Sequence, residues 1–214
     1  MKNLTLLFIL IPCFVFGQQR KTLPPPPGPP PPESKEQMAW DKKHNSCFNT
    51  SQYDVKQRRA FFPFNSAARV KLISFSTDDI PYWPIAVNNF SIDSTKVKES
   101  KVLSPAGIDS LTDIMYNVGF TPMKHKRPQI KGVNELEVAD RGYMCIFQPR
   151  NAILFIDSTG KVTQYISICF TCHQYYLSSR KIKYTVNCED KYELLRGYFL
   201  SQNIRYGTKR EEQL

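Results

Sequence analysis

Apolar and polar positions alternate or repeat along this chain in patterns that predict a few strands and helices. Residues 69–75 alternate polar and apolar side chains, which is typical of a strand. A stretch that starts at Ser104 and Pro105 has apolar residues three or four apart and a glycine at its end. It predicts a helix that ends at Gly119. Residues 192–204 carry a second helical pattern.

The C-terminal half contains a predicted β-hairpin. Residues 144–157 and 162–170 are both rich in isoleucine, valine and aromatic residues, and a turn-forming Asp-Ser-Thr-Gly sequence joins them. With Ile156 opposite Val162, the two strands pair in an antiparallel register. The strands and helices together predict an α+β fold: one domain in which an antiparallel sheet carries two or more packed helices.

The N-terminus has the pattern of a secretory signal peptide over residues 1–17. A basic start precedes the apolar residues 4–16, and Gly17 supplies the small residue before the cleavage site. The apolar run is shorter than the roughly 20 residues that a transmembrane helix needs, and no later segment resembles one. We therefore expect a soluble protein, exported to the periplasm or the extracellular space. Lipidation at Cys13 is the weaker alternative, because proline occupies the preceding position.

Two regions are predicted to follow the signal peptide. Residues 18–37 contain a proline-rich run at 24–32 and are expected to form a disordered spacer, because proline runs are extended and lack amide donors. Residues 38–214 are long enough for one domain with its own core and too short for two. The chemistry of the protein should therefore lie in residues 38–214.

The most specific motif is Cys-x-x-Cys-His, formed by Cys169, Cys172 and His173. The predicted hairpin register brings Cys145 to the same open end of the hairpin, within reach of both other cysteines. Export to an oxidising compartment favours disulfides. We therefore expect Cys145 to form a disulfide with Cys169 or Cys172 that cross-links the hairpin. Of the six cysteines, Cys13 leaves with the signal peptide, so an odd number remains.

Three other kinds of chemistry fit the same cysteines. The motif matches a c-type haem attachment site, in which Cys169 and Cys172 would bind haem covalently and His173 would ligate the iron. The three cysteines could instead exchange thiols and disulfides, with one of them as a resolving thiol. A zinc site is the third alternative, and an oxidising compartment counts against it. The candidate second axial ligands of a haem are Met123, His125 and Met144, and zinc ligands would come from Cys145, Cys169, Cys172 and either His173 or Cys188.

The net charge and the remaining motifs of the chain indicate which classes of binding partner to expect. The formal net charge is +10, and basic residues cluster at 124–127, 180–183 and 209–210. Outside the cytoplasm such a surface favours a cell-envelope component or another anionic surface, and no nucleic-acid-binding motif is present. Arg150 lies among apolar residues close to Cys145 and is the best single candidate for a binding residue. No recognised catalytic motif is present, so the sequence favours a non-enzymatic module.

The hairpin region also resembles a pattern seen in exported bacterial proteins. It consists of Cys145, then Pro149 and Arg150, and then a Cys-Phe-x-Cys sequence that ends at Cys172. The resemblance is to an uncharacterised, Bacteroidota-like family of exported proteins, and it implies a cysteine-centred hairpin without implying an activity. The sequence thus predicts a binding or structural module of the cell envelope with a disulfide-stapled hairpin. A thiol redox protein and a c-type haem protein are the alternatives.

Overall fold

The computed structural model describes residues 33–76, 87–88, 91–129, 145–183, 185 and 188–208. The chain divides into two units, residues 1–32 and residues 33–214, and every helix and strand given below belongs to the second unit. The predicted signal peptide and the proline run lie outside the described residues. The first helix begins at Lys35, so regular structure starts inside the region that was predicted to be a spacer.

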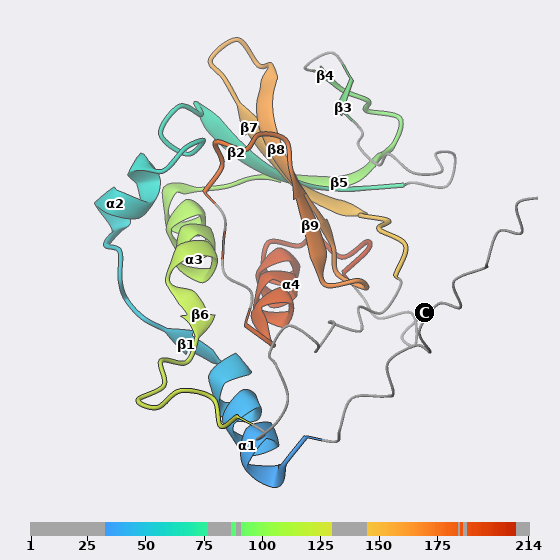
Figure 1. Ribbon diagram of the computed structural model, residues 1–214. Coiled ribbons are helices and arrows are strands. Elements are labelled where there is room, and N and C mark those ends of the chain that lie inside the picture. Colours follow the sequence, from blue (N-terminus) through green and yellow to red (C-terminus); the bar gives the residue numbers. More distant parts are fainter. Residues whose placement is uncertain are drawn as a thin grey trace, which may run out of the picture. The chain divides into compact units, whose positions relative to one another are not determined.

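A five-stranded antiparallel sheet with the strand order β5-β2-β7-β8-β9 forms the centre of the fold (Figure 1). Its strands are β2 (Arg69–Phe75), β5 (Val97–Val102), β7 (Asn151–Ile156), β8 (Val162–Cys169) and β9 (Gln174–Leu177). Two short antiparallel pairs accompany it: β1 (Cys47–Asn49) with β6 (Val118–Phe120), and β3 (Val87–Asn88) with β4 (Ser91–Ile92). The strand predicted at residues 69–75 is confirmed at both ends.

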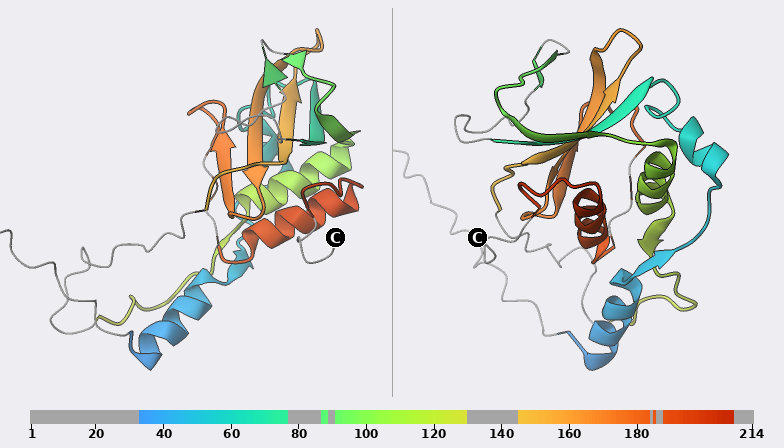
Figure 2. Two further views of the ribbon diagram at one scale, coloured as in Figure 1. Left: turned by 90° about the vertical axis from the view of Figure 1, so that its right-hand side faces the viewer. Right: turned by 180° about the vertical axis from the view of Figure 1, so that it is seen from behind.

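The helices of the described residues are α1 (Lys35–Asn45), α2 (Val55–Ala60), α3 (Pro105–Tyr116) and α4 (Lys191–Ser201). Helices α3 and α4 lie side by side on one face of the five-stranded sheet (Figure 2). The helix predicted at residues 192–204 corresponds to α4, which ends at Ser201. The predicted α+β class, with helices packed on an antiparallel sheet, is therefore confirmed.

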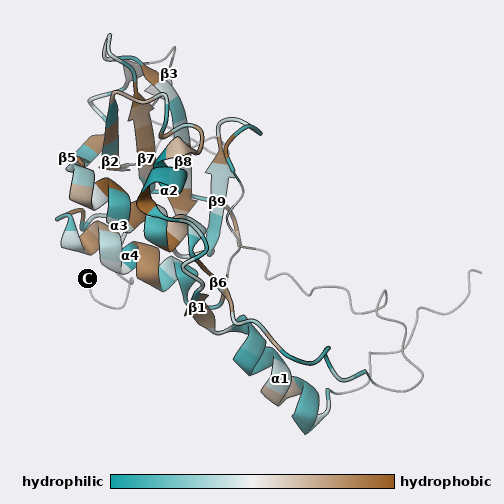
Figure 3. Ribbon diagram, turned by 90° about the vertical axis from the view of Figure 1, so that its left-hand side faces the viewer, coloured by the Kyte–Doolittle hydropathy of each residue, from teal (hydrophilic) through white to brown (hydrophobic). Residues whose placement is uncertain are grey.

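The main hydrophobic core lies between the sheet and helices α3 and α4. All six residues of β7 are buried, and their alternating side chains serve both faces of the sheet. Ile153 and Phe155 join the core under the helices, whereas Leu154 and Ile156 join a second apolar cluster on the opposite face. The apolar colouring of β7 is visible in Figure 3. A strand buried on both faces needs a continuous apolar run, which residues 152–156 of β7 supply.

The hairpin of β7 and β8 differs from the predicted one in two ways. Ile156 pairs with Val162 as expected, but a bulge next to this pair shifts the register, so that Phe155 lies opposite Gln164. The predicted first strand was also too long, because β7 begins only at Asn151 and residues 145–150 have no regular structure. Proline within those residues removes a backbone donor, which disfavours strand pairing there.

The helix predicted from Ser104 begins as expected and ends earlier than expected. The Ser104 side chain caps the helix by accepting a backbone hydrogen bond from the first turn. The helix ends at Tyr116, and residues 118–120 then form strand β6, which pairs with β1. Between them lies Asn117, whose side-chain amide exchanges hydrogen bonds of 2.9 and 3.0 Å with the backbone of Tyr53. Gly119, the predicted end, lies instead in strand β6.

Candidate functional site

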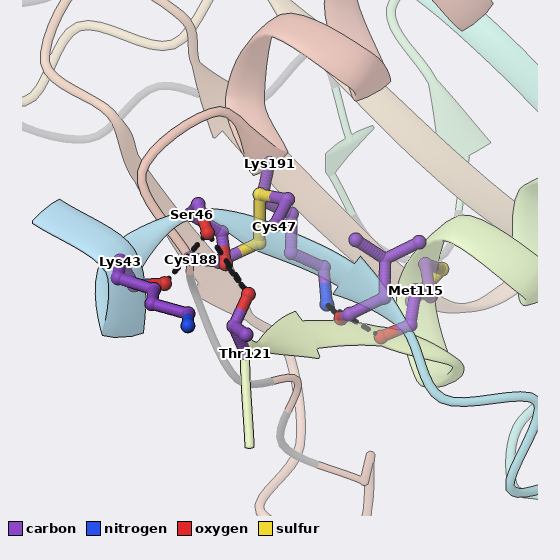
Figure 4. Close-up of a disulfide and its surroundings, with 8 residues drawn as sticks. Lys43, Ser46, Cys47, Met115, Thr121, Cys188 and Lys191 are labelled. Atoms are coloured by element: carbon purple, nitrogen blue, oxygen red, sulfur yellow. Dashed lines mark hydrogen bonds between the residues drawn. A yellow bond between two sulfur atoms is a disulfide. The ribbon is translucent and has the colours of Figure 1, made fainter. Parts of the chain in front are cut away.

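A disulfide between Cys47 and Cys188 joins β1 to the segment that leads into α4 (Figure 4). The S–S distance is 2.02 Å, and the two cysteines are 141 positions apart. No local pattern pairs these cysteines, so the sequence did not reveal this bond. In a model in which a disulfide acts by restricting the unfolded chain, a loop of this length contributes about 5 kcal/mol.

The second disulfide joins Cys145 to Cys172, which is one of the two partners that the hairpin register left open for Cys145. The Cα atoms are 5.6 Å apart, and the residues are 27 positions apart. Cys145 lies in the irregular segment before β7, and Cys172 lies in the turn between β8 and β9. The bond therefore closes the open end of the hairpin, and its loop contributes about 3.5 kcal/mol in the same model.

Cys169, the last residue of β8, is the one cysteine of the described residues that forms no disulfide. It is buried, with 3% of its surface exposed. A c-type haem would need the sulfur atoms of both Cys169 and Cys172, and the latter is bonded to Cys145. Haem attachment therefore requires that the Cys145–Cys172 disulfide is not formed, and it stays a hypothesis. Met144, one of its candidate axial ligands, lies outside the described residues.

His173 follows the second disulfide and turns its ring toward α4. Its φ angle of 51° places it in the left-handed region, which suits the tight turn between β8 and β9. The imidazole stacks on the ring of Tyr192, with 5.3 Å between the ring centroids and 8° between the planes. Its Nε2 atom lies 3.7 Å from Oε1 of Glu193. About half of the His173 side chain is exposed, so the ring remains accessible beside α4.

A cleft of about 630 Å³ lies beside this histidine. Its walls come from the last turn of α1, the end of β6, the turn that holds His173, and residues 188–192, which lead into the first turn of α4. The lining combines aromatic rings, a cation, an amide and a carboxylate. The residues are Lys42, Asn45, Phe120, His173, Cys188, Glu189 and Tyr192. One disulfide borders this cleft through Cys188, and the other lies next to it in sequence, because Cys172 directly precedes His173.

Lys191, in the first turn of α4, is a buried residue that stabilises the protein next to the cleft through hydrogen bonds to the backbone. Its ammonium group donates hydrogen bonds of 2.8 and 2.7 Å to the carbonyls of Met115 and Val118, beside the Cys47–Cys188 bond (Figure 4). The side chain is 1% exposed, and burial lowers the pKa of Lys191 to about 8. Nothing in the sequence indicates this role, because a lysine near the start of a helix usually lies in solvent.

Arg150, the predicted binding residue, does not line the cleft. It lies just before β7, and its carbonyl accepts a hydrogen bond of 2.9 Å from the backbone of Phe75. The C-terminal segment passes close to it at Gly207, whose φ of 72° is left-handed. A Cβ atom at Gly207 would lie 2.5 Å from Cβ of Arg150, so only glycine fits there. The surroundings of Arg150 therefore include this close backbone contact, and its role in binding stays a prediction.

The described residues contain no helix that is long and apolar enough to cross a membrane. Within the same ranges, no group of three or more histidine, cysteine, aspartate or glutamate residues is placed to hold a metal ion. Three of the sulfur atoms considered for a zinc site, those of Cys145, Cys172 and Cys188, are in disulfides. No protein-family model, curated protein or solved structure matches this chain.

Proposed function

We propose that this chain is an exported binding module of the cell envelope, and that its ligand site is the cleft between α1, β6 and α4. The observation that supports this most is that two disulfides cross-link the walls of this cleft or their neighbours: Cys188 of one lines the cleft, and Cys172 of the other directly precedes the lining residue His173. Disulfides persist in oxidising compartments, which agrees with the signal-peptide pattern at residues 1–17. Cross-links around a cleft fix its walls, and a preformed site binds with a smaller entropic cost.

The chemistry of the cleft favours binding over catalysis. Phe120 offers a partly exposed ring, and Lys42, Asn45 and Glu189 offer polar groups of three kinds. Among the lining residues the sulfur of Cys188 is in a disulfide, so it is not available as a nucleophile. A few polar groups around aromatic side chains are typical of ligand sites.

Sedimentation of the purified, oxidised protein with washed envelope fractions tests this proposal. Phe120→Ala and His173→Asn should each weaken binding about tenfold, because they remove aromatic groups from the cleft. Asparagine is chosen at His173 because it tolerates the left-handed backbone. Phe48→Ala is the matched control, since Phe48 is an exposed phenylalanine of the β1–β6 pair that does not line the cleft. Wild-type protein that stays in the supernatant, or a Phe120→Ala variant that binds like wild type, would refute the proposal.

Thiol–disulfide exchange is a second candidate function, supported by the free Cys169 thiol three residues from Cys172. In that reaction the Cys169 thiolate would attack the Cys172 sulfur, form a Cys169–Cys172 bond and release Cys145 as a thiolate that takes up a proton. Burial of Cys169 counts against rapid exchange. Peptide mapping after equilibration with glutathione tests it: a Cys169–Cys172 peptide supports exchange, and its absence over the whole redox range excludes it.

A further inference from the structure

Residues 33–46 and 121–129, called here the basic arm, form a unit in which a helix and an irregular segment are joined by side-chain to backbone bonds. The amide of Gln37 donates to the carbonyl of Pro128 at 2.9 Å, and the indole of Trp40 donates to the carbonyl of His125 at 3.1 Å. These bonds fix the irregular segment against α1. Gln37 is the one buried residue of α1, so most of this helix is left facing outward.

The outward surface of the basic arm carries positive charge that the described residues do not neutralise. Arg127 binds both Asp41, at 2.6 Å, and Glu33, at 3.0 Å, and the Asp41 bond is the main reason that its pKa is raised. This pairing removes two of the three acidic groups of the basic arm, and Glu36 is the third. Five exposed lysines remain, and none forms an ion pair with another described residue: Lys35, Lys42, Lys43, Lys124 and Lys126. Such a surface attracts polyanions.

The same combination of groups occurs twice along α1. The cleft described above has the ring of Phe120, the amide of Asn45 and the ammonium of Lys42. A second, open cleft of about 670 Å³ is lined by Trp40, Lys126, Arg127 and Gln129, and so again combines an aromatic ring, an amide and cations. A repeated set of groups fits a ligand that itself repeats.

A continuous aromatic stack connects the two clefts. The ring of His44 lies between the rings of Trp40 and Phe120, with centroid distances of 4.6 and 4.9 Å. His44 is fixed in place by a 3.2 Å contact between Nδ1 and the carbonyl of Thr121. Trp40 lines one cleft and Phe120 lines the other, so a chain-like ligand could follow the stack from cleft to cleft.

The composition of α1 argues against a lipid bilayer as the partner. Helices that lie in a membrane interface have a broad apolar face, whereas α1 is polar on most sides and has Met38 as its one strongly exposed large apolar residue. Figure 3 shows α1 largely in hydrophilic colours. Ammonium groups, amides and flat aromatic faces instead match the acidic groups, hydroxyls and ring faces of a charged sugar chain.

We propose that the basic arm and the two clefts along it bind an anionic polysaccharide, with the lysines on its acidic groups and the cleft-lining rings of Trp40 and Phe120 on its sugar rings. This proposal rests on the proposed function, because Lys42, Asn45 and Phe120 belong to both. It adds the chemical class of the ligand and extends the site from one cleft to two.

The test is a titration of the protein with polygalacturonate, a carboxylated polysaccharide, at low and at physiological salt. The test variant is Lys42→Gln/Lys43→Gln/Lys126→Gln, which removes three exposed cations of the basic arm. The control is Lys98→Gln/Lys101→Gln/Lys161→Gln, which removes three exposed cations from β5 and from the turn between β7 and β8. We expect binding that weakens with salt, a loss of at least roughly tenfold in the test variant, and a change within about twofold in the control.

Parallel titrations with dextran, with vesicles of anionic phospholipid and with duplex DNA complete the test. Equal affinity for dextran would overturn the charge requirement, and tighter binding of vesicles or DNA would overturn the polysaccharide assignment. Equal losses in both triple variants would overturn the role of the basic arm. Envelope binding that depends on Phe120 but is not matched by polygalacturonate would refute this inference and leave the proposed function standing. Absence of both kinds of binding would refute both.

Discussion

The sheet core and the basic arm are stabilised in different ways. In the core, all six residues of β7 are buried, and the side chains of Phe155, Leu72 and Leu111 are fully enclosed. In the basic arm, only one residue of α1 is buried. The neighbouring Cys47–Cys188 disulfide and hydrogen bonds to the backbone stabilise this region instead of buried apolar side chains. The stability of the core should therefore be sensitive to changes in the volume of its buried side chains, and that of the basic arm to the loss of cross-links. The outward side chains of the basic arm are not needed for packing and can contact a ligand.

The largest expected effect comes from removing the long-range disulfide. The variant Cys47→Ser/Cys188→Ser should lose up to about 5 kcal/mol of unfolding free energy. Urea unfolding measures the loss, and amide hydrogen exchange locates it. Exchange should accelerate most in α1, β1 and β6, which can then also open locally, while β7 and β8 remain the slowest-exchanging strands. Equal acceleration in both regions would show that the basic arm and the core do not differ as described.

A substitution that leaves a cavity in the sheet core should also lower the unfolding free energy, here through lost packing. Phe155 is fully buried and packs edge-on against Phe64, with 4.9 Å between ring centroids. Phe155→Ala should therefore cost about 4 kcal/mol in unfolding free energy. Leu200→Ala, at an exposed position of α4, is the control and should cost less than about 1 kcal/mol. Similar losses in the two variants would contradict the placement of the core.

A smaller effect is expected from pH, through Lys191, which lies where the two regions meet. Its pKa is about 8 in the folded chain, because of burial, and 10.5 is the ordinary value. Between these values the unfolded chain binds more protons, so stability rises with pH by up to about 3 kcal/mol. The neutral amine still has two N–H groups for the carbonyls of Met115 and Val118.

Urea unfolding between pH 7 and pH 10.5 tests this titration. The comparison is between Cys169→Ala, which removes the free thiol, and Cys169→Ala/Lys191→Met. The difference in stability between the two proteins should grow in favour of the lysine form above pH 8, and tyrosine ionisation cancels in the difference. A difference that stays constant over this range would show that Lys191 keeps an ordinary pKa.

Local features of the fold could be predicted from the sequence, because they depend on neighbouring residues. Strand β2 and the start of α3 follow from alternation and from the Ser104 cap. The start of α1 is also marked in the sequence, although the spacer prediction did not take it into account. Ser34 and Gln37 form a capping box, in which each side chain bonds to the backbone of the other. With that pattern, the boundary of the domain could have been placed before Met38.

The features that were missed depend on residues far apart in the chain. Helix α3 ends where Asn117 bonds to Tyr53, and nothing near Asn117 reveals that partner. The same holds for Cys47 and Cys188, which are 141 positions apart. The cleft itself joins α1, β6, a turn and α4, so no single motif marks it. The Cys-x-x-Cys-His motif pointed to one border of the cleft and not to the rest.

The most direct test of this account is a disulfide map of the protein, because the cleft depends on which cysteines are paired. The protein should be exported to the periplasm of an expression host, treated with an alkylating reagent at once, and digested without reduction. We expect one peptide pair that contains Cys47 and Cys188 and another that contains Cys145 and Cys172. Cys169 should be alkylated only after denaturation. A Cys169–Cys172 bond, or reduced Cys47 and Cys188, would contradict the proposed cross-linking of the cleft.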